Sequence, residues 1–162
     1  MKIRKLTALA LCVALLAVVL TACGGSDDSD KTNPNSDGVS EVGSGKAEYA
    51  VILKTLSNDF WATMKKGIED EAKKLGITVD IFAAQNEEDT AGQLTILENC
   101  LTKGYKSIGV APLSPTNLIN GIVQANEKGI YVMNIDEKID IQSLGNAGGS
   151  VIGFATTDNV AV

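Results

Sequence analysis

The 162-residue chain contains no histidine, one tryptophan, three prolines and three cysteines, and aromatic residues make up only 4% of it. The lack of histidine excludes histidine-based zinc sites and the usual acid–base triads within these residues. No Walker or dinucleotide fingerprint is present either. We therefore expect neither a cofactor nor a metal site, and we expect that the protein is not an enzyme.

Basic residues are also scarce, with fourteen Lys and Arg against twenty Asp and Glu and a net charge of -6. Lys2, Arg4 and Lys5 lie at the extreme N-terminus, so removing that segment leaves eleven basic residues against twenty acidic ones, a net charge of -9. An acidic protein of this kind disfavours nucleic acid or anionic lipid as a partner.

The N-terminus has the pattern of a secretion signal. Its basic residues precede an uncharged apolar stretch from 6 to 20, and small residues then lead to Cys23. This stretch is short for a membrane span, which needs about 20 residues, and a cysteine at the cleavage point is typical of bacterial lipoproteins. We predict a lipoprotein signal peptide over 1–22 and a lipid on Cys23. A cleaved soluble-secretion signal or a retained anchor is the alternative, and each reading puts the folded part outside the cytoplasm.

Residues 23–46 are rich in Gly, Ser, Asp and Asn and contain almost no large apolar side chain. Such a segment cannot bury enough surface to fold, so we predict a flexible linker. The folded part is then 47–162, close to the usual size of one domain.

The three cysteines do not predict a disulfide. Cys12 leaves with the signal peptide and Cys23 is used by the lipid, so Cys100 remains alone. Its apolar neighbours in a helical stretch favour a buried structural thiol over a nucleophile.

The folded part alternates apolar strands with amphipathic helices. Gly76, Gly104 and Gly129 each come within two residues after a lysine at the end of a helical stretch, as left-handed glycines do at helix C-termini. The predicted strands are 49–53, 78–82, 107–110, 130–134 and 151–155. This pattern predicts an α/β fold with a doubly wound parallel sheet of flavodoxin-like order. Its ligand site is expected beyond the carboxyl ends of the strands.

The junction after the first strand holds most of the candidate site. Lys54 and Asn58 supply hydrogen-bonding groups, and Phe60 and Trp61 begin a helix. The two rings point about 100° apart, so at least one is expected to face the ligand, and aromatic faces stack well on sugars. Trp61 fits the core stripe of the helix better than Phe60 does.

Asp136 follows the fourth strand, where its carboxylate can accept hydrogen bonds from two neighbouring hydroxyl groups. A turn aspartate is the alternative reading. The run Glu87-Glu88-Asp89 at a helix start is interpreted as solvated charge that favours the helix dipole.

At these residues the chain resembles the ribose-type periplasmic sugar-binding proteins of ABC importers. The resemblance covers 48–162 and rests on such runs as E-Y-A-V-I-L-K-T-L-S-N-D-F-W, K-G-I-Y-V-M-N-I-D-E-K-I-D and T-T-D-N-V-A-V. It implies that the chain forms the N-terminal lobe of a two-lobed, monomeric binding protein. Such a protein closes on one monosaccharide of the allose or ribose kind and delivers it to a membrane permease. The ligand-binding residues that the resemblance implies are Lys54, Asn58, Phe60, Trp61, Asp136, Thr157 and Asp158.

Two positions depart from the family pattern. Asp59 stands where relatives often have proline, and Ala111 stands where ribose binders carry an asparagine, which argues against ribose itself. The resemblance also implies a second lobe with further sugar ligands, and without it we expect these residues to bind sugar poorly or not at all.

Three other classes of protein share this fold. A receptor for a sugar or a furanosyl autoinducer that serves a signalling or chemotaxis partner is the main alternative. An enzyme of flavodoxin-like fold would need a nucleophile or metal cluster outside these residues. A sugar-responsive repressor is excluded by the secretion signal and by the lack of an N-terminal DNA-binding helix pair.

Overall fold

The computed structural model describes residues 40–42 and 46–158. The predicted signal peptide, Cys23 and most of the predicted linker lie outside this range. Among the described residues, no helix has the length and apolar character needed to cross a bilayer.

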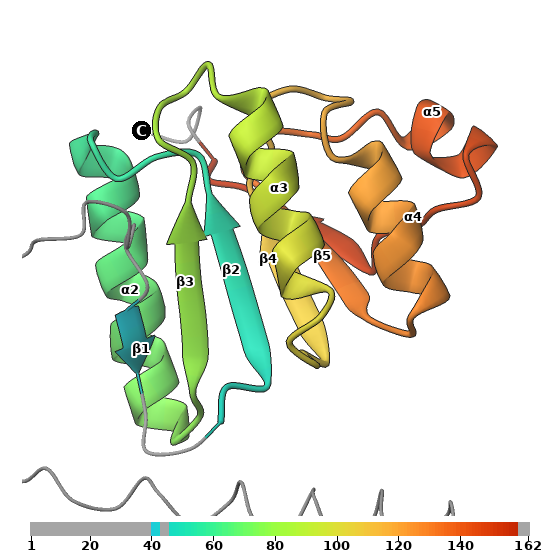
Figure 1. Ribbon diagram of the computed structural model, residues 1–162. Helices are drawn as coiled ribbons and strands as arrows, with labels where there is room; N and C mark the ends of the chain where they lie inside the picture. The colour runs from blue at the N-terminus through green and yellow to red at the C-terminus, as the bar shows by residue number, and fades with distance from the viewer. Residues whose placement is uncertain (1–39, 43–45, 159–162) are drawn as a thin grey trace, which may run out of the picture. The chain divides into compact units, whose positions relative to one another are not determined.

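The described residues form one six-stranded sheet with the order β1-β3-β2-β4-β5-β6 (Figure 1). Its strands are β1 (Ser40–Val42), β2 (Tyr49–Leu53), β3 (Val79–Ala83), β4 (Ser107–Val110), β5 (Tyr131–Ile135) and β6 (Gly153–Ala155). Strands β2 to β6 are parallel, and β1 pairs antiparallel with β3 at the edge. The order of the five parallel strands confirms the predicted doubly wound sheet.

Four helices connect the parallel strands. They are α2 (Asp59–Leu75), α3 (Thr90–Cys100), α4 (Ile119–Glu127) and α5 (Ile141–Asn146). Helix α2 begins where the Asn58 side chain accepts a hydrogen bond from Phe60 N, and it ends at Gly76, whose φ is 66°. Gly104 and Gly129 also have positive φ, so all three predicted left-handed glycines are confirmed.

The core has two parts, one on each face of the sheet. Helices α3, α4 and α5 pack on one face, where Ile52, Ile108 and Val132 are fully buried. Helix α2 packs on the other face against Leu53 and Ile81. Because neighbouring residues of β2 are buried on opposite faces, its lack of polar alternation is explained by helices on both sides.

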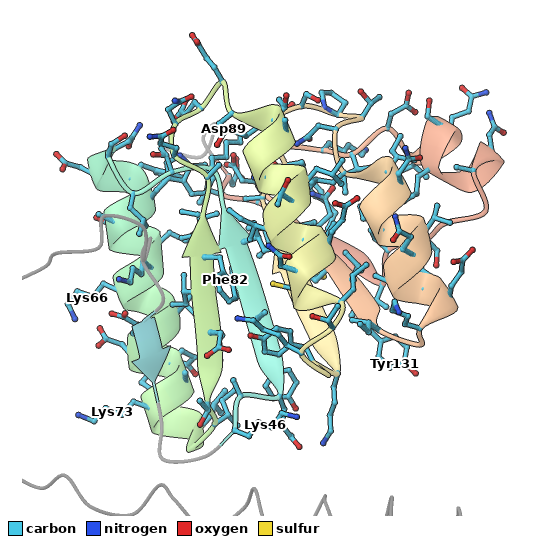
Figure 2. All side chains as sticks on the ribbon, in the orientation of Figure 1. Lys46, Lys66, Lys73, Phe82, Asp89 and Tyr131 are labelled. Carbon is cyan, nitrogen blue, oxygen red and sulfur yellow. The ribbon has the colours of Figure 1, made fainter. Side chains whose placement is uncertain are left out.

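The side chains follow the same division. Lys66 and Lys73 point outward from α2, and Phe82 lies on the face of β3 that α3 covers (Figure 2). On the α2 face, a groove of about 350 Å³ is lined by Val51, Met133 and other apolar residues of the helix and sheet.

The structure differs from the sequence prediction in three details. The strand β1 lies within the segment predicted as a linker, and α5 was not predicted. Three of the predicted strands begin or end one or two residues away from β3, β5 and β6.

Candidate functional site

The candidate site lies at the carboxyl edge of the sheet, where β2 and β4 are neighbours. The chain leaves β2 for α2 on one face and leaves β4 for α4 on the other, so the two connections diverge. This is the topological switch point at which open α/β sheets bind their ligands. In Figure 1 the arrowheads of β2 and β3 end at this edge, beside the start of α2.

Lys54, the first residue after β2, joins side chains from two predicted junctions. Its Nζ lies 3.6 Å from Asp136 Oδ2, 3.4 Å from Glu137 Oε2 and 5.8 Å from the centre of the Trp61 ring. The Lys54 and Asp136 side chains are only 15% and 25% exposed. The structure therefore brings the predicted cation and carboxylate together, with the indole beside them at the same edge.

Asp136 is held by the backbone around it. Its φ is 61°, a left-handed conformation that no other described non-glycine residue adopts. Its N–H donates to the Ala155 carbonyl at 2.8 Å, which ties the loop after β5 to β6. The fully buried Asn134 amide donates to the Glu137 carbonyl at 2.7 Å and accepts from Ile139 N at 3.0 Å. These contacts hold the backbone that carries the Asp136 carboxylate.

Asn58, Phe60 and Trp61 lie together at the start of α2. The Oδ1 atom of Asn58 accepts from Phe60 N at 2.8 Å as the helix cap, and its amide nitrogen remains available as a donor. The two rings meet edge to face with their centres 4.9 Å apart. Phe60 is 44% exposed and Trp61 only 3%. Phe60 is therefore the ring with free area for stacking, whereas Trp61 belongs to the α2 core, and its ligand role stays a prediction that its burial does not favour.

Glu87 is exposed, as the sequence interpretation has it, but it is also a hydrogen-bond acceptor for two residues of the candidate site. Its Oε1 atom accepts hydrogen bonds from Trp61 Nε1 at 3.3 Å and from Asn58 Nδ2 at 3.5 Å. Asp89, in the same acidic run, accepts from Gly92 N at 2.9 Å as the N-cap of α3. The run thus contains a helix cap and a contact to the candidate site.

Gln93 is a fully buried polar residue that the sequence analysis did not select. Its amide nitrogen donates to the Ala111 carbonyl at 2.8 Å and lies 3.4 Å from the Leu53 carbonyl. Its Oε1 atom accepts from Leu113 N and from Asn117 Nδ2, both at 2.9 Å. One side chain of α3 therefore connects the ends of β2 and β4 at the switch point.

Thr157 and Asp158 follow β6 and are both exposed. Thr157 lines a pocket of about 360 Å³ together with Asp136, Ile135 and Met64. It thus lines the same pocket as Asp136, and its role as a ligand at the rim stays a prediction. The pocket itself is mainly apolar where α2 faces β5 and β6.

The described residues hold no group of three His, Cys, Asp or Glu side chains placed to bind a metal ion. Cys100 is 1% exposed, as predicted for a structural thiol. Burial raises the pKa of this thiol from 9.0 to about 11, so it is a poor nucleophile near neutral pH.

Comparison with known proteins identifies relatives of the chain. Residues 49–162 match the family described as "Periplasmic binding protein domain". The D-allose-binding periplasmic protein of Escherichia coli is 60% identical over 116 residues, which are 72% of this chain and 37% of that protein. A ribose import binding protein of Bacillus subtilis is 30% identical over 155 residues, which are 94% of this chain and 46% of that protein. The chain therefore spans less than half the length of these relatives.

Solved structures with a similar fold are also solute-binding proteins. An ABC transporter periplasmic solute binding protein of Actinobacillus succinogenes with bound D-allose has a TM-score of 0.63 and 28% identity, and the match covers 67% of this chain and 38% of that one. The myo-inositol binding protein of Caulobacter, bound to myo-inositol, has a TM-score of 0.60 and 29% identity, over 71% of this chain and 36% of that one.

Proposed function

Because the chain belongs to the periplasmic binding protein family, we propose that it is the N-terminal lobe of a sugar-binding protein that serves an ABC importer. The ligand is a neutral monosaccharide of the allose or ribose kind. Binding occurs without chemical change to the sugar, and the loaded protein delivers the sugar to a membrane permease.

One observation carries the proposal: the Lys54 ammonium, the Asp136 carboxylate and the exposed Phe60 ring belong to one edge of the sheet. The ammonium donates hydrogen bonds, and the carboxylate accepts them from two adjacent hydroxyl groups. A sugar hydroxyl can do both, so a single ring can bridge the pair that lies 3.6 Å apart.

The exposed ring completes the recognition of a sugar. One face of a pyranose carries C–H groups, which pack on an aromatic ring, while its hydroxyl groups point to the sides. Phe60 offers such a surface, since 44% of it is exposed beside the polar groups. A site of this kind discriminates strongly, because a ligand that lacks a hydroxyl leaves buried polar groups unpaired.

The described residues supply one side of the binding cleft in this proposal. Relatives of known structure are two to three times longer than the part that matches, so the groups that cover the other side of the sugar belong to a second lobe. Closure of the two lobes around a hinge is the step that reports an occupied site to the importer.

The location of the protein is a further part of the proposal. A signal peptide over 1–22 and a lipid on Cys23 tether the folded lobe to the outer face of a membrane through the linker. The tether keeps the binding protein close to its permease and raises its effective concentration there.

A calorimetric titration tests the proposed function. Protein expressed from the complete gene is titrated with D-allose, D-ribose and myo-inositol, with glucose 6-phosphate as a charged comparison. We expect one neutral monosaccharide to bind at one site per chain and to be recovered unchanged. Absence of binding by every neutral monosaccharide tried, or turnover of the sugar, would contradict the proposal.

A further inference from the structure

Glu87 lies in the loop between β3 and α3, yet it contacts the start of α2. A single carboxylate oxygen accepts from the Trp61 indole N–H at 3.3 Å and from the Asn58 amide at 3.5 Å. Both donors stand at the edge that holds the candidate site. The loop after β3 contains no predicted ligand-binding residue. Through Glu87 it contacts two such residues, Asn58 and Trp61.

The Trp61 indole needs this acceptor. The ring is 97% buried in the α2 core, and a buried indole N–H without a partner costs free energy. Among the described residues, Glu87 is the acceptor that the structure gives it. The neighbouring Glu88 is also exposed, but its side chain makes no hydrogen bond or ion pair within the described part of the chain. The contact is thus specific to one member of the acidic run.

Trp61 in turn contacts two other residues of the site. The Phe60 ring meets it edge to face, with centres 4.9 Å apart, and the Lys54 ammonium lies 5.8 Å from its centre. A rotation of the indole ring would change the surface against which Phe60 and Lys54 lie. The hydrogen bond restrains the direction of the indole N–H, and together with the packing of the buried ring it limits such a rotation.

We propose that Glu87 is a positioning residue for the sugar site and acts through Trp61 and Asn58. The inference rests on the proposed function for its effect on affinity, but the contact itself does not depend on any ligand. In this role the carboxylate holds the indole, against which Phe60 and Lys54 lie, and the Asn58 amide in one arrangement, which reduces the ordering needed when a sugar binds.

Three variants of the protein expressed from the complete gene test the proposal. Glu87→Ala removes the acceptor, Glu87→Gln keeps an amide oxygen in its place, and Glu88→Ala is the matched control one residue away. The first measurement is the Trp61 indole N–H resonance of the ligand-free protein, assigned with Trp61→Phe. The second is the affinity for D-allose by calorimetry, and the third is the melting temperature.

We expect Glu87→Ala to shift the indole resonance and to weaken D-allose binding roughly three- to tenfold, the worth of one hydrogen bond. In Glu87→Gln, the indole resonance and the affinity for D-allose are expected to be close to those of the wild type. In Glu88→Ala, neither the resonance nor the affinity is expected to change. Glu87→Ala also leaves the buried indole N–H without its acceptor, so its melting temperature is expected to fall, whereas those of Glu87→Gln and Glu88→Ala are expected to stay close to that of the wild type.

Several outcomes would overturn the proposal. An unchanged indole resonance in Glu87→Ala would show that the contact does not form in solution. A shifted resonance with unchanged affinity would show that the contact does not position the site. If Glu87→Ala and Glu88→Ala changed the resonance and the affinity equally, the cause would be the loss of one negative charge and not the loss of the Glu87 contact. If the wild type binds no monosaccharide, the proposed function fails and the positioning role fails with it, while the resonance still decides whether the contact exists.

Discussion

Lys54 and Asp136 follow different strands, β2 and β5, yet their Nζ and Oδ2 atoms lie 3.6 Å apart. Glu137 adds a second carboxylate oxygen 3.4 Å from the same ammonium. The pair combines a hydrogen-bond donor and an acceptor at the switch point of the sheet. Substitutions at Asp136 therefore test both the site and its unusual backbone.

Asp136→Asn is expected to weaken monosaccharide binding by about 100-fold, because hydrogen bonds to a charged acceptor contribute about 1.5–3 kcal/mol each. Asparagine tolerates the left-handed backbone, so the melting temperature is expected to change little. Calorimetry on the complete protein gives the affinity. A matched control is Asp70→Asn, which removes a carboxylate from an exposed ion pair on α2. An affinity equal to that of the wild type would remove Asp136 from the site.

The backbone at Asp136 makes a separate prediction about stability. Both Asp136→Gly and Asp136→Ala remove the carboxylate, so the loss of the ion pair cancels between them. With φ at 61°, alanine is strained and glycine is not. We expect the free energy of unfolding of Asp136→Ala to be about 1 kcal/mol lower than that of Asp136→Gly. Urea denaturation measures the difference, and equal midpoints would show that the left-handed conformation is not kept in solution.

Gln93→Leu is expected to lower the free energy of unfolding by about 2–4 kcal/mol. The change leaves the Ala111 carbonyl and the Leu113 N–H buried without their partner, and each such group costs about 1–3 kcal/mol. Gln85→Leu, at an exposed position in the loop after β3, is the control and is expected to change stability by less than about 0.5 kcal/mol. Similar denaturation midpoints for the two variants would contradict the role assigned to Gln93.

Cys100 is expected to resist thiol reagents in the folded protein. Because its pKa is raised from 9.0 to about 11, only about one thiol in a thousand is ionised at pH 8. The folded state favours the protonated thiol, so this contribution to stability is fully present below pH 9 and is lost as the pH rises toward 11. Reaction with a disulfide reagent, with and without denaturant, measures the difference. Rapid labelling of the native protein at pH 8 would contradict the prediction.

Cys23→Ser tests the predicted lipid anchor. We expect the wild type to sediment with membranes and to incorporate labelled fatty acid, and the variant to lose both properties. Cys100→Ser is the matched control, since that thiol is buried in the folded lobe. A variant that still sediments with membranes and carries fatty acid would show that Cys23 is not the point of attachment.

The sequence predicted the sheet well because its signals are local. The bounds of β2 and β4 agree with the predicted strands, since β2 is an apolar run between Glu48 and Lys54 and β4 lies between Lys106 and the turn at Pro112. In contrast, β1 has only three residues in a polar segment, and its strand conformation depends on pairing with β3. Helix α5 has six residues, too few for an apolar period to be recognised. Its Asp140 cap, which accepts from Gln142 N and Ser143 N, was the available signal.

The candidate site was predictable only in part for a related reason. Lys54 and Asp136 stand directly after apolar strands, so the rule for parallel sheets places them at one edge. Glu87 and Gln93 act through contacts between segments far apart in the sequence. No spacing of residues in the chain predicts these contacts. The burial of Trp61 followed from its place on the apolar stripe of α2, whereas the acceptor of its indole N–H required the folded structure.

Lys54 and Asp136 carry opposite charges that pair within the site, and the monosaccharide proposed as the ligand is uncharged. The association rate of an uncharged sugar then depends little on long-range electrostatic attraction. Dissolved salt, which screens such attraction, is therefore expected to change this rate little. In the proposed function, capture of the sugar would therefore be similarly efficient in dilute and in saline surroundings.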